Sequence, residues 1–121
     1  MSEFTAIESL IQDYFQGLHH GNLELVQKAF LPEAEVFGYY EGELVKITLR
    51  EYLNILKRQS PPALLGEDFD MQVSGIDQIG QIASVRTRYL FQALRYTEFL
   101  SLLKISGSWK IVSKTFHHDP D

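Results

Sequence analysis

The sequence predicts one α+β domain, in which helices from the first half cover one face of an antiparallel sheet formed by the second half. Two patterns predict this class. Apolar residues in the first half recur every three or four positions, as on an amphipathic helix. Residues 77–117 instead alternate with period two, as in consecutive strands. A chain of 121 residues is long enough for one hydrophobic core, so the domain is predicted to span 1–121.

Two helices are expected at the start of the chain. Apolar side chains over residues 4–18 lie on one stripe of a first helix. A second, shorter helix follows and cannot continue past Pro32. The residues that suit the ends of these helices are Ser2 or Thr5, then Gly21, and then Asn22.

A strand pair and a third helix come next. Residues 34–40 and 43–47 are predicted to form two short strands around a tight turn. Thr48 and Glu51 have the spacing of a capping box and open a third helix, which ends before a Pro-Pro pair. A further strand is predicted from about residue 67 to residue 73, with a bend at Gly75.

The alternation assigns side chains of the last three strands to two faces of the sheet. We expect odd-numbered residues such as Tyr89 and Trp109 to face the helices, and even-numbered ones such as Arg88 to face away. On this basis the acidic residues Asp70 and Glu98 face outward, and no inward carboxylate is expected. A bulge or a slipped register would change these assignments.

Composition limits the possible partners and compartments. The net charge is −5, and the basic residues of the last strands alternate with apolar ones, so we expect no nucleic-acid partner. The chain has no cysteine, no membrane-length apolar run and no visible secretory signal. We therefore expect a cytoplasmic protein with no membrane partner.

Three segments resemble a known family. Residues 14–22 (YFQGLHHGN), 30–34 (FLPEA) and 109–116 (WKIVSKTF) are similar to segments of the putative lumazine-binding family, within the nuclear transport factor 2-like superfamily. The family often has His where this chain has Leu31. The resemblance implies a cone, a cystatin-like α+β roll: a strongly curved, mostly antiparallel sheet wrapped around three helices, with a pocket inside. It also implies pairing of two copies through the outer sheet surface.

A cone would line its pocket with inward side chains from the sheet and the helices, mostly apolar with a few polar groups. His117 would lie at the rim, where a histidine can act as an acid or base. We therefore predict a small, largely apolar ligand, no cofactor, and the following pocket residues: Tyr14, Phe15, Tyr39, Tyr52, Thr87, Tyr89, Phe99, Ser101, Ser113, Thr115 and His117.

The opposite face carries too many large apolar side chains for a surface left in water. A symmetric homodimer would cover it. The residues predicted at that interface are Arg88, Leu90, Leu100, Leu102, Val112 and Phe116. No metal is expected at the two His-His pairs, because adjacent side chains diverge on a helix and point to opposite faces of a strand.

Three functions remain open from the sequence. The first is a homodimeric domain that binds a small molecule. The second is a cofactor-free isomerase, cyclase or dehydratase, with His117 as base and a tyrosine as hydrogen-bond donor. The third is a protein-interaction or assembly module. A carboxylate inside the pocket would favour the enzyme, whereas a pocket filled by its own aromatic side chains would favour the interaction module.

Overall fold

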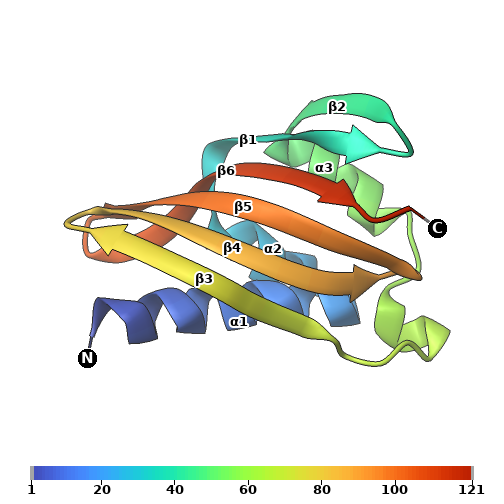
Figure 1. Cartoon of the computed structure of the whole chain (residues 1–121), viewed down its shortest axis with the longest axis horizontal. Coiled ribbons are helices and arrows are strands. Elements are labelled where there is room, and N and C mark those ends of the chain that lie inside the picture. Colours follow the sequence, from blue (N-terminus) through green and yellow to red (C-terminus); the bar gives the residue numbers. More distant parts are fainter. Residues whose placement is uncertain (1, 121) are drawn as a thin grey trace.

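A computed structural model describes residues 2–120 and confirms the α+β class. In Figure 1 a curved six-stranded sheet lies in front of the helices, with the strand order β2-β1-β6-β5-β4-β3. The predicted domain, 1–121, extends one residue beyond the described residues at each end. No helix within the described range is long and apolar enough to cross a membrane.

The predicted helix ends are confirmed, and the structure decides between Ser2 and Thr5 as the cap of the first helix. Ser2, not Thr5, caps the first helix, because its hydroxyl accepts the backbone N–H of Thr5 at 3.1 Å. Gly21 follows that helix with a φ of 72°. The capping box of Thr48 and Glu51 is complete in both directions. The helices are α1 (Glu3–His20), α2 (Leu23–Ala29), α3 (Leu49–Lys57) and the short 3-10 helix η1 (Pro62–Leu65).

The strands are β1 (Phe30–Tyr40), β2 (Glu43–Thr48), β3 (Met71–Ile79), β4 (Ile82–Phe91), β5 (Leu94–Ile105) and β6 (Ser108–His118). All neighbours are antiparallel except β1 and β6, which are parallel. β1 begins four residues earlier than predicted, because Phe30 already pairs with Ile111. β3 begins later than predicted, at Met71, while the Glu67 carboxylate instead accepts N–H groups of the β4–β5 turn. The bend at Gly75 is confirmed by a register shift in β3.

The turn between β4 and β5 makes the predicted facing of β5 wrong. Its two residues, Gln92 and Ala93, have φ of 51° and 68°, the backbone of a two-residue hairpin turn. This turn pairs odd-numbered residues of β4 with even-numbered residues of β5, as in Thr87 with Glu98. Paired residues share a face, so Glu98 and its even-numbered neighbours on β5 point toward the helices.

A bulge changes the facing again within β6. The β5–β6 register shifts between Ser101–Ser113 and Leu102–Ile111. Before the shift the odd-numbered residues of β6 are buried, as predicted for Trp109 and Ile111. After it the even-numbered Lys114 is buried instead, because the extra residue turns the rest of the strand over.

Candidate functional site

A lysine and a glutamate are buried together on the inner face of the sheet. Lys114 Nζ lies 3.3 Å from Glu98 Oε2, and the two side chains are 3% and 0% exposed. Glu98 comes from the middle of β5 and Lys114 from β6 after its bulge. Charged side chains are rarely buried so completely unless they are paired, and even then the desolvation cost is high. A pair of this kind is weak evidence for stability and directs attention to function.

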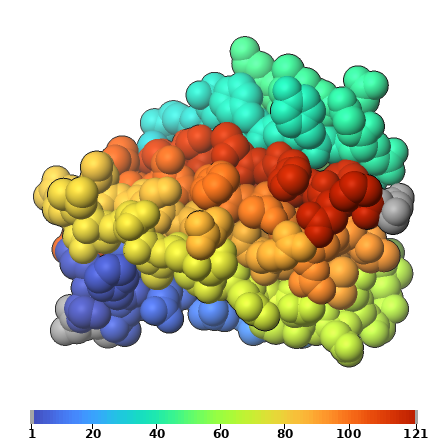
Figure 2. All heavy atoms as spheres, viewed as in Figure 1, coloured from blue at the N-terminus to red at the C-terminus, as the bar shows by residue number. Residues whose placement is uncertain are grey.

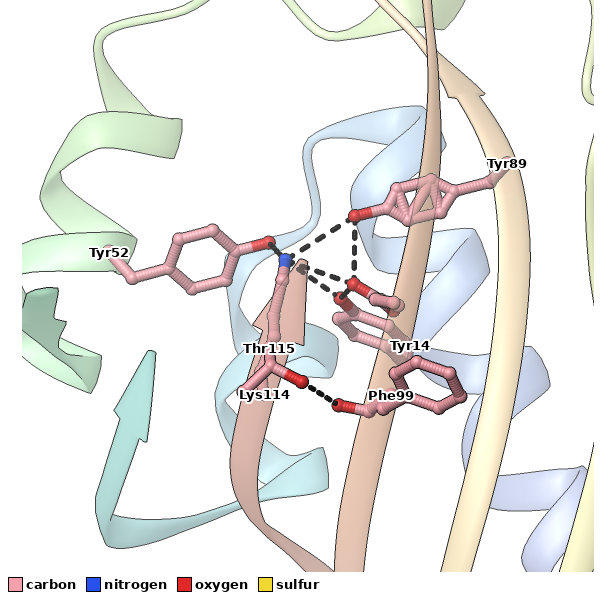
Figure 3. A network of polar contacts seen from close by, with 7 residues as sticks. Tyr14, Tyr52, Tyr89, Phe99, Lys114 and Thr115 are labelled. Atoms are coloured by element: carbon pink, nitrogen blue, oxygen red, sulfur yellow. Dashed lines mark hydrogen bonds and ion pairs between the residues drawn. The ribbon is translucent and has the colours of Figure 1, made fainter. Parts of the chain in front are cut away.

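Three tyrosines complete the cluster, which we call the Lys114 cluster: Lys114, Glu98, Tyr14, Tyr52 and Tyr89. Tyr14 and Tyr89 donate hydrogen bonds to Glu98 Oε2 at 3.1 and 3.0 Å. Lys114 Nζ donates to the hydroxyls of Tyr52, Tyr14 and Tyr89 at 2.7, 3.1 and 3.3 Å. Figure 3 shows the lysine amine between the phenols, with Tyr52 on the side of α3 and Tyr89 on β4.

The electrostatics of the Lys114 cluster favour a protonated lysine and neutral phenols. Burial, reinforced by the Glu98 charge, raises the pKa of the Tyr14 and Tyr89 phenols well above 10.0. Burial alone would lower the pKa of Lys114, but the Glu98 carboxylate and the Tyr52 hydroxyl together hold it above 10.5. At neutral pH the cluster therefore contains an ammonium group and neutral phenols.

One acceptor of the Lys114 cluster remains without a partner within residues 2–120. Glu98 Oε1 is buried and has no partner, and the same holds for Thr87 Oγ1 on the neighbouring strand. The Tyr52 hydroxyl accepts a hydrogen bond from Lys114 at 2.7 Å. Because a buried polar group without a partner costs free energy, such groups in a native protein call for an explanation.

A cavity of about 290 Å³ opens beside the cluster, between α3, the β1–β2 hairpin and one end of the sheet. Lys114, Tyr52 and Tyr89 form part of its wall, whereas Glu98 and Tyr14 lie behind them, fully buried. The remaining lining is mostly apolar or aromatic: Leu18, Val36, Tyr40, Val45, Ile47, Ile55, Leu56, Phe91, Leu94, Tyr96 and Phe116, with Gln59 and Gln92. An apolar cavity with a few converging polar groups is the usual form of a small-molecule site.

The predicted pocket residues divide into three groups. Tyr52 and Tyr89 line the cavity. Tyr14, Phe15 and Thr87 are fully buried beside it without lining it. The others lie elsewhere, partly or largely exposed: Tyr39, Phe99, Ser101, Ser113, Thr115 and His117.

The misplaced residues follow from the turn and the bulge. Phe99 and Ser101 lie on the outer face, because the β4–β5 turn reverses β5. Thr115 and His117 lie there because the bulge reverses the end of β6. His117 was expected at the inner rim as an acid or base, and this expectation is wrong. His118 points inward in its place, and its ring packs against the cavity residues Tyr40 and Tyr96.

The same two features change the predicted dimer residues. Leu100 and Leu102 are 0% and 1% exposed within a single chain, so they cannot form a subunit contact. Phe116 lines the cavity. Leu90 and Val112 are half-buried, and Arg88 is exposed in an ion pair with Asp119 at 2.6 Å.

The two histidine pairs lie in different surroundings. His19 is buried at the end of α1 against Phe69, and His118 accepts the Glu41 backbone N–H at 2.9 Å. Across residues 2–120 there is no group of three His, Asp or Glu side chains that could hold a metal ion.

Sequence reasoning missed the two central residues, Glu98 and Lys114. One signal was available: Glu98 is the single acidic residue among six basic ones over residues 81–116. The turn that reverses β5 carries no such signal, because Gln92-Ala93 lacks the Gly or Asn typical of two-residue hairpins.

Comparison with known proteins identifies the family. The model of the putative lumazine-binding family matches residues 2–117. The chain belongs to this family. A curated relative, called aldolase FrzH, from Cladobotryum sp, is 29% identical over 121 residues, covering 98% of this chain and 94% of that protein.

Solved structures related to this lumazine-binding family member share its nuclear transport factor 2-like fold. A protein of unknown function from Shewanella baltica has a TM-score of 0.86 at 25% identity, covering 98% of this chain and 95% of that one. One from Silicibacter pomeroyi has a TM-score of 0.83 at 23% identity, covering 98% and 100%. A cystatin-like fold protein from Burkholderia xenovorans has a TM-score of 0.70 at 17% identity, covering 97% and 92%.

Proposed function

We propose that this chain is an enzyme that makes or breaks a carbon–carbon bond next to the carbonyl group of a small, largely apolar compound. The compound would occupy the cavity, and the reaction would be of the aldol type. The observation that carries this proposal is the Lys114 cluster itself: a buried ammonium and two phenols at the wall of a mostly apolar cavity, with a carboxylate and a third phenol directly behind them.

The position of Tyr52 at the cavity wall supports a ligand with an oxygen acceptor. The Tyr52 hydroxyl lines the cavity and receives a 2.7 Å hydrogen bond from Lys114, which polarises its O–H bond. When an aldol is cleaved, the electron pair of the broken bond moves onto the carbonyl oxygen as an enolate. Fixed donors aimed at such an oxygen in a dry site are a strong source of catalysis.

A carboxylate supports chemistry beyond binding. Cleavage also requires that the hydroxyl of the aldol lose its proton, which the enolate carbon later recovers. Glu98 is one contact away from the cavity through either Lys114 or Tyr89, and its Oε1 is free to take a proton. The sequence left binding and catalysis open and named a carboxylate inside the pocket as the feature that favours an enzyme. Glu98 does not line the cavity, but it is buried directly behind the cavity wall, in contact with Lys114 and Tyr89.

The relative called an aldolase agrees with this chemistry, and its similarity extends over nearly the whole chain. The proposed reaction uses this chain's own side chains. It replaces the isomerase, cyclase or dehydratase with His117 as base, because His117 lies on the outer face.

The test is cleavage of a panel of small aldol adducts, beginning with that of acetone and benzaldehyde, followed by the absorbance of the released benzaldehyde. Tyr52→Phe should lower kcat/KM about 10²- to 10³-fold, as for loss of one donor to a developing oxyanion. The exposed Tyr39→Phe is the matched control and should be unchanged. Equal rates for Tyr52→Phe and the unsubstituted chain would contradict the proposal, and so would a panel that is neither bound nor cleaved.

We also propose that two copies pair through the outer face of the sheet, which is turned toward the viewer in Figure 2. The residues differ from those expected from the sequence. Ile82, Phe99 and Leu103 are 56%, 54% and 38% exposed, and Ile82 pairs directly with Leu103 across β4 and β5. A symmetric pair of copies would remove this apolar surface from water.

A further inference from the structure

We infer that Lys114 is a nucleophile that forms an imine with the carbonyl carbon of the compound bound in the cavity. This inference rests on the proposed function and specifies its chemistry. The enolate-type reaction proposed above would then run through a covalent iminium, with the lysine nitrogen in place of the carbonyl oxygen.

Position favours Lys114 over the other lysines of the chain. Its amine lies at the wall of an apolar cavity that can hold a small carbonyl compound. By contrast, Lys104 is held in an ion pair with Glu3 at 2.7 Å, and Lys110 donates to the Lys28 carbonyl at 2.7 Å on the exposed side. A lysine becomes a nucleophile toward a carbonyl group once it loses a proton, and the Glu98 carboxylate at 3.3 Å is the base placed to accept it.

The groups around the amine can carry the protons that imine formation moves. One ammonium hydrogen passes to Glu98, and the freed nitrogen lone pair bonds to the carbonyl carbon. The carbonyl π electrons move to oxygen, which receives a proton from the Tyr52 hydroxyl. A second nitrogen hydrogen then restores the Tyr52 phenol, and the proton held by Glu98 passes to the carbinol oxygen. The C–O bond breaks, water leaves, and the nitrogen lone pair forms the C=N bond. Ammonium plus carbonyl thus give iminium plus water, with no net gain or loss of protons.

The surroundings suit a permanent cation at this nitrogen. The Nζ atom lies 4.2 Å from the ring centroid of Tyr52, 5.5 Å from that of Phe116 and 5.7 Å from that of Tyr14. Aromatic faces attract cations, most strongly where water is excluded. The Glu98 carboxylate at 3.3 Å supplies the opposite charge. The same contacts that hold the ammonium would therefore hold an iminium.

The test is reductive trapping of the full chain with cyclohexanone and, separately, benzaldehyde in the presence of cyanoborohydride. Reduction converts the iminium into a stable secondary amine, heavier by the carbonyl compound less one oxygen atom. Peptide mass mapping of the unsubstituted chain then locates the adduct without relying on a variant. Lys114 should be modified faster than Lys110 and should saturate with probe concentration. Modification of Lys114 no faster than that of Lys110 would overturn the inference.

Variants separate the role of Glu98 from that of Lys114. Glu98→Gln should slow trapping about 10²-fold or more, the usual contribution of a positioned acid or base. It should also make the rate rise with pH, because the ammonium must then lose its proton to solvent. Lys110→Arg, on the same strand, should leave trapping at Lys114 unchanged. A Glu98→Gln rate and pH profile equal to those of the unsubstituted chain would contradict the proton transfer to Glu98.

Failure of this inference differs visibly from failure of the proposed function. If aldol adducts are cleaved in a Tyr52-dependent manner while Lys114 remains unmodified, the reaction proceeds through an enolate and the imine is excluded. If no adduct of the panel is bound or cleaved and Lys114 is not trapped, both proposals fail.

Discussion

The two halves of strand β6 face the same helices but build different environments. Before the bulge, Trp109 and Ile111 are buried in the apolar core with Leu102 and Val85. After it, Lys114 is buried among phenols and a carboxylate beside a cavity. One extra residue separates a packed core from a candidate active site on a single strand. Bulges are known to re-aim side chains in this manner next to active sites.

The largest effect should come from breaking the charge pair in the second half. Lys114→Met leaves the Glu98 carboxylate buried without its cation, and should lower the free energy of unfolding by about 3–5 kcal/mol. The double variant Glu98→Leu/Lys114→Met should recover most of this loss while remaining inactive. Ile111→Val, in the apolar half, should cost only about 0.5–1.5 kcal/mol. Urea unfolding measures all three, and a double variant no more stable than Lys114→Met would contradict a cost that arises from an unpaired charge.

The close contact between Gly38 on β1 and Phe116 on β6 allows the cavity wall to be disturbed without changing a charge. A Cβ on Gly38 would lie 2.4 Å from both the ring and the carbonyl oxygen of Phe116, which lines the cavity. Gly38→Ala should therefore destabilise the chain by about 1–3 kcal/mol, the usual cost of overpacking, and weaken probe binding. Gly75→Ala meets only the end of the Arg86 side chain, at 3.2 Å, and serves as the control. Equal effects of the two substitutions on probe binding would argue against this contact.

Alkaline pH should act on the second half of β6, because the buried phenols lie around that half. Burial raises the pKa of Tyr96 to about 12, and those of Tyr14 and Tyr89 also lie well above 10.0. The folded chain thus keeps protons that the unfolded chain loses, so the free energy of unfolding should decrease as pH rises above 10. In an ultraviolet titration Tyr96 should ionise near pH 12, and the fully buried Tyr14 and Tyr89 should ionise only with unfolding. Their ionisation at the ordinary pKa of tyrosine in a folded chain would contradict their burial.

Changes on the outer face should affect the cavity least. Phe99→Asp places a charge on the proposed subunit contact, and light scattering should then show a monomer where the unsubstituted chain has twice the monomer mass. The cavity should be unaffected, so trapping at Lys114 should continue at a similar rate. A monomeric unsubstituted chain would exclude the proposed pairing.

The sequence predicted the helices well, because their signals are local. The cap at Asn22, the capping box at Thr48 and the glycine at position 21 each depend on a few adjacent residues. Most strand positions were also predictable from alternation, as for Ala83 to Tyr89 on β4. The family resemblance supplied the cone, which local patterns do not specify.

The site was only partly predictable, because facing depends on register. Tyr52 and Tyr89 were expected at the pocket and line the cavity. Glu98 and Lys114 were not, because a two-residue turn and a bulge reverse the parity of β5 and β6, and neither carries a glycine or asparagine signal. A period-two pattern fixes which residues lie together on one strand. It does not fix which of the two sets faces the core when both contain apolar residues.

The parallel pairing of β1 with β6 has a consequence for biosynthesis. β1 can pair at once with β2, but its second neighbour is β6, where Phe30 pairs with Ile111, and β6 is made only when nearly the whole chain is complete. Contacts so distant in sequence are slow to form, and a chain emerging from the ribosome presents its N-terminal part first. The helices and the β3–β5 meander can therefore assemble while the cavity is still missing one wall. A nascent chain would complete its core and its cavity together, when β6 brings Trp109, Ile111 and Lys114 into place.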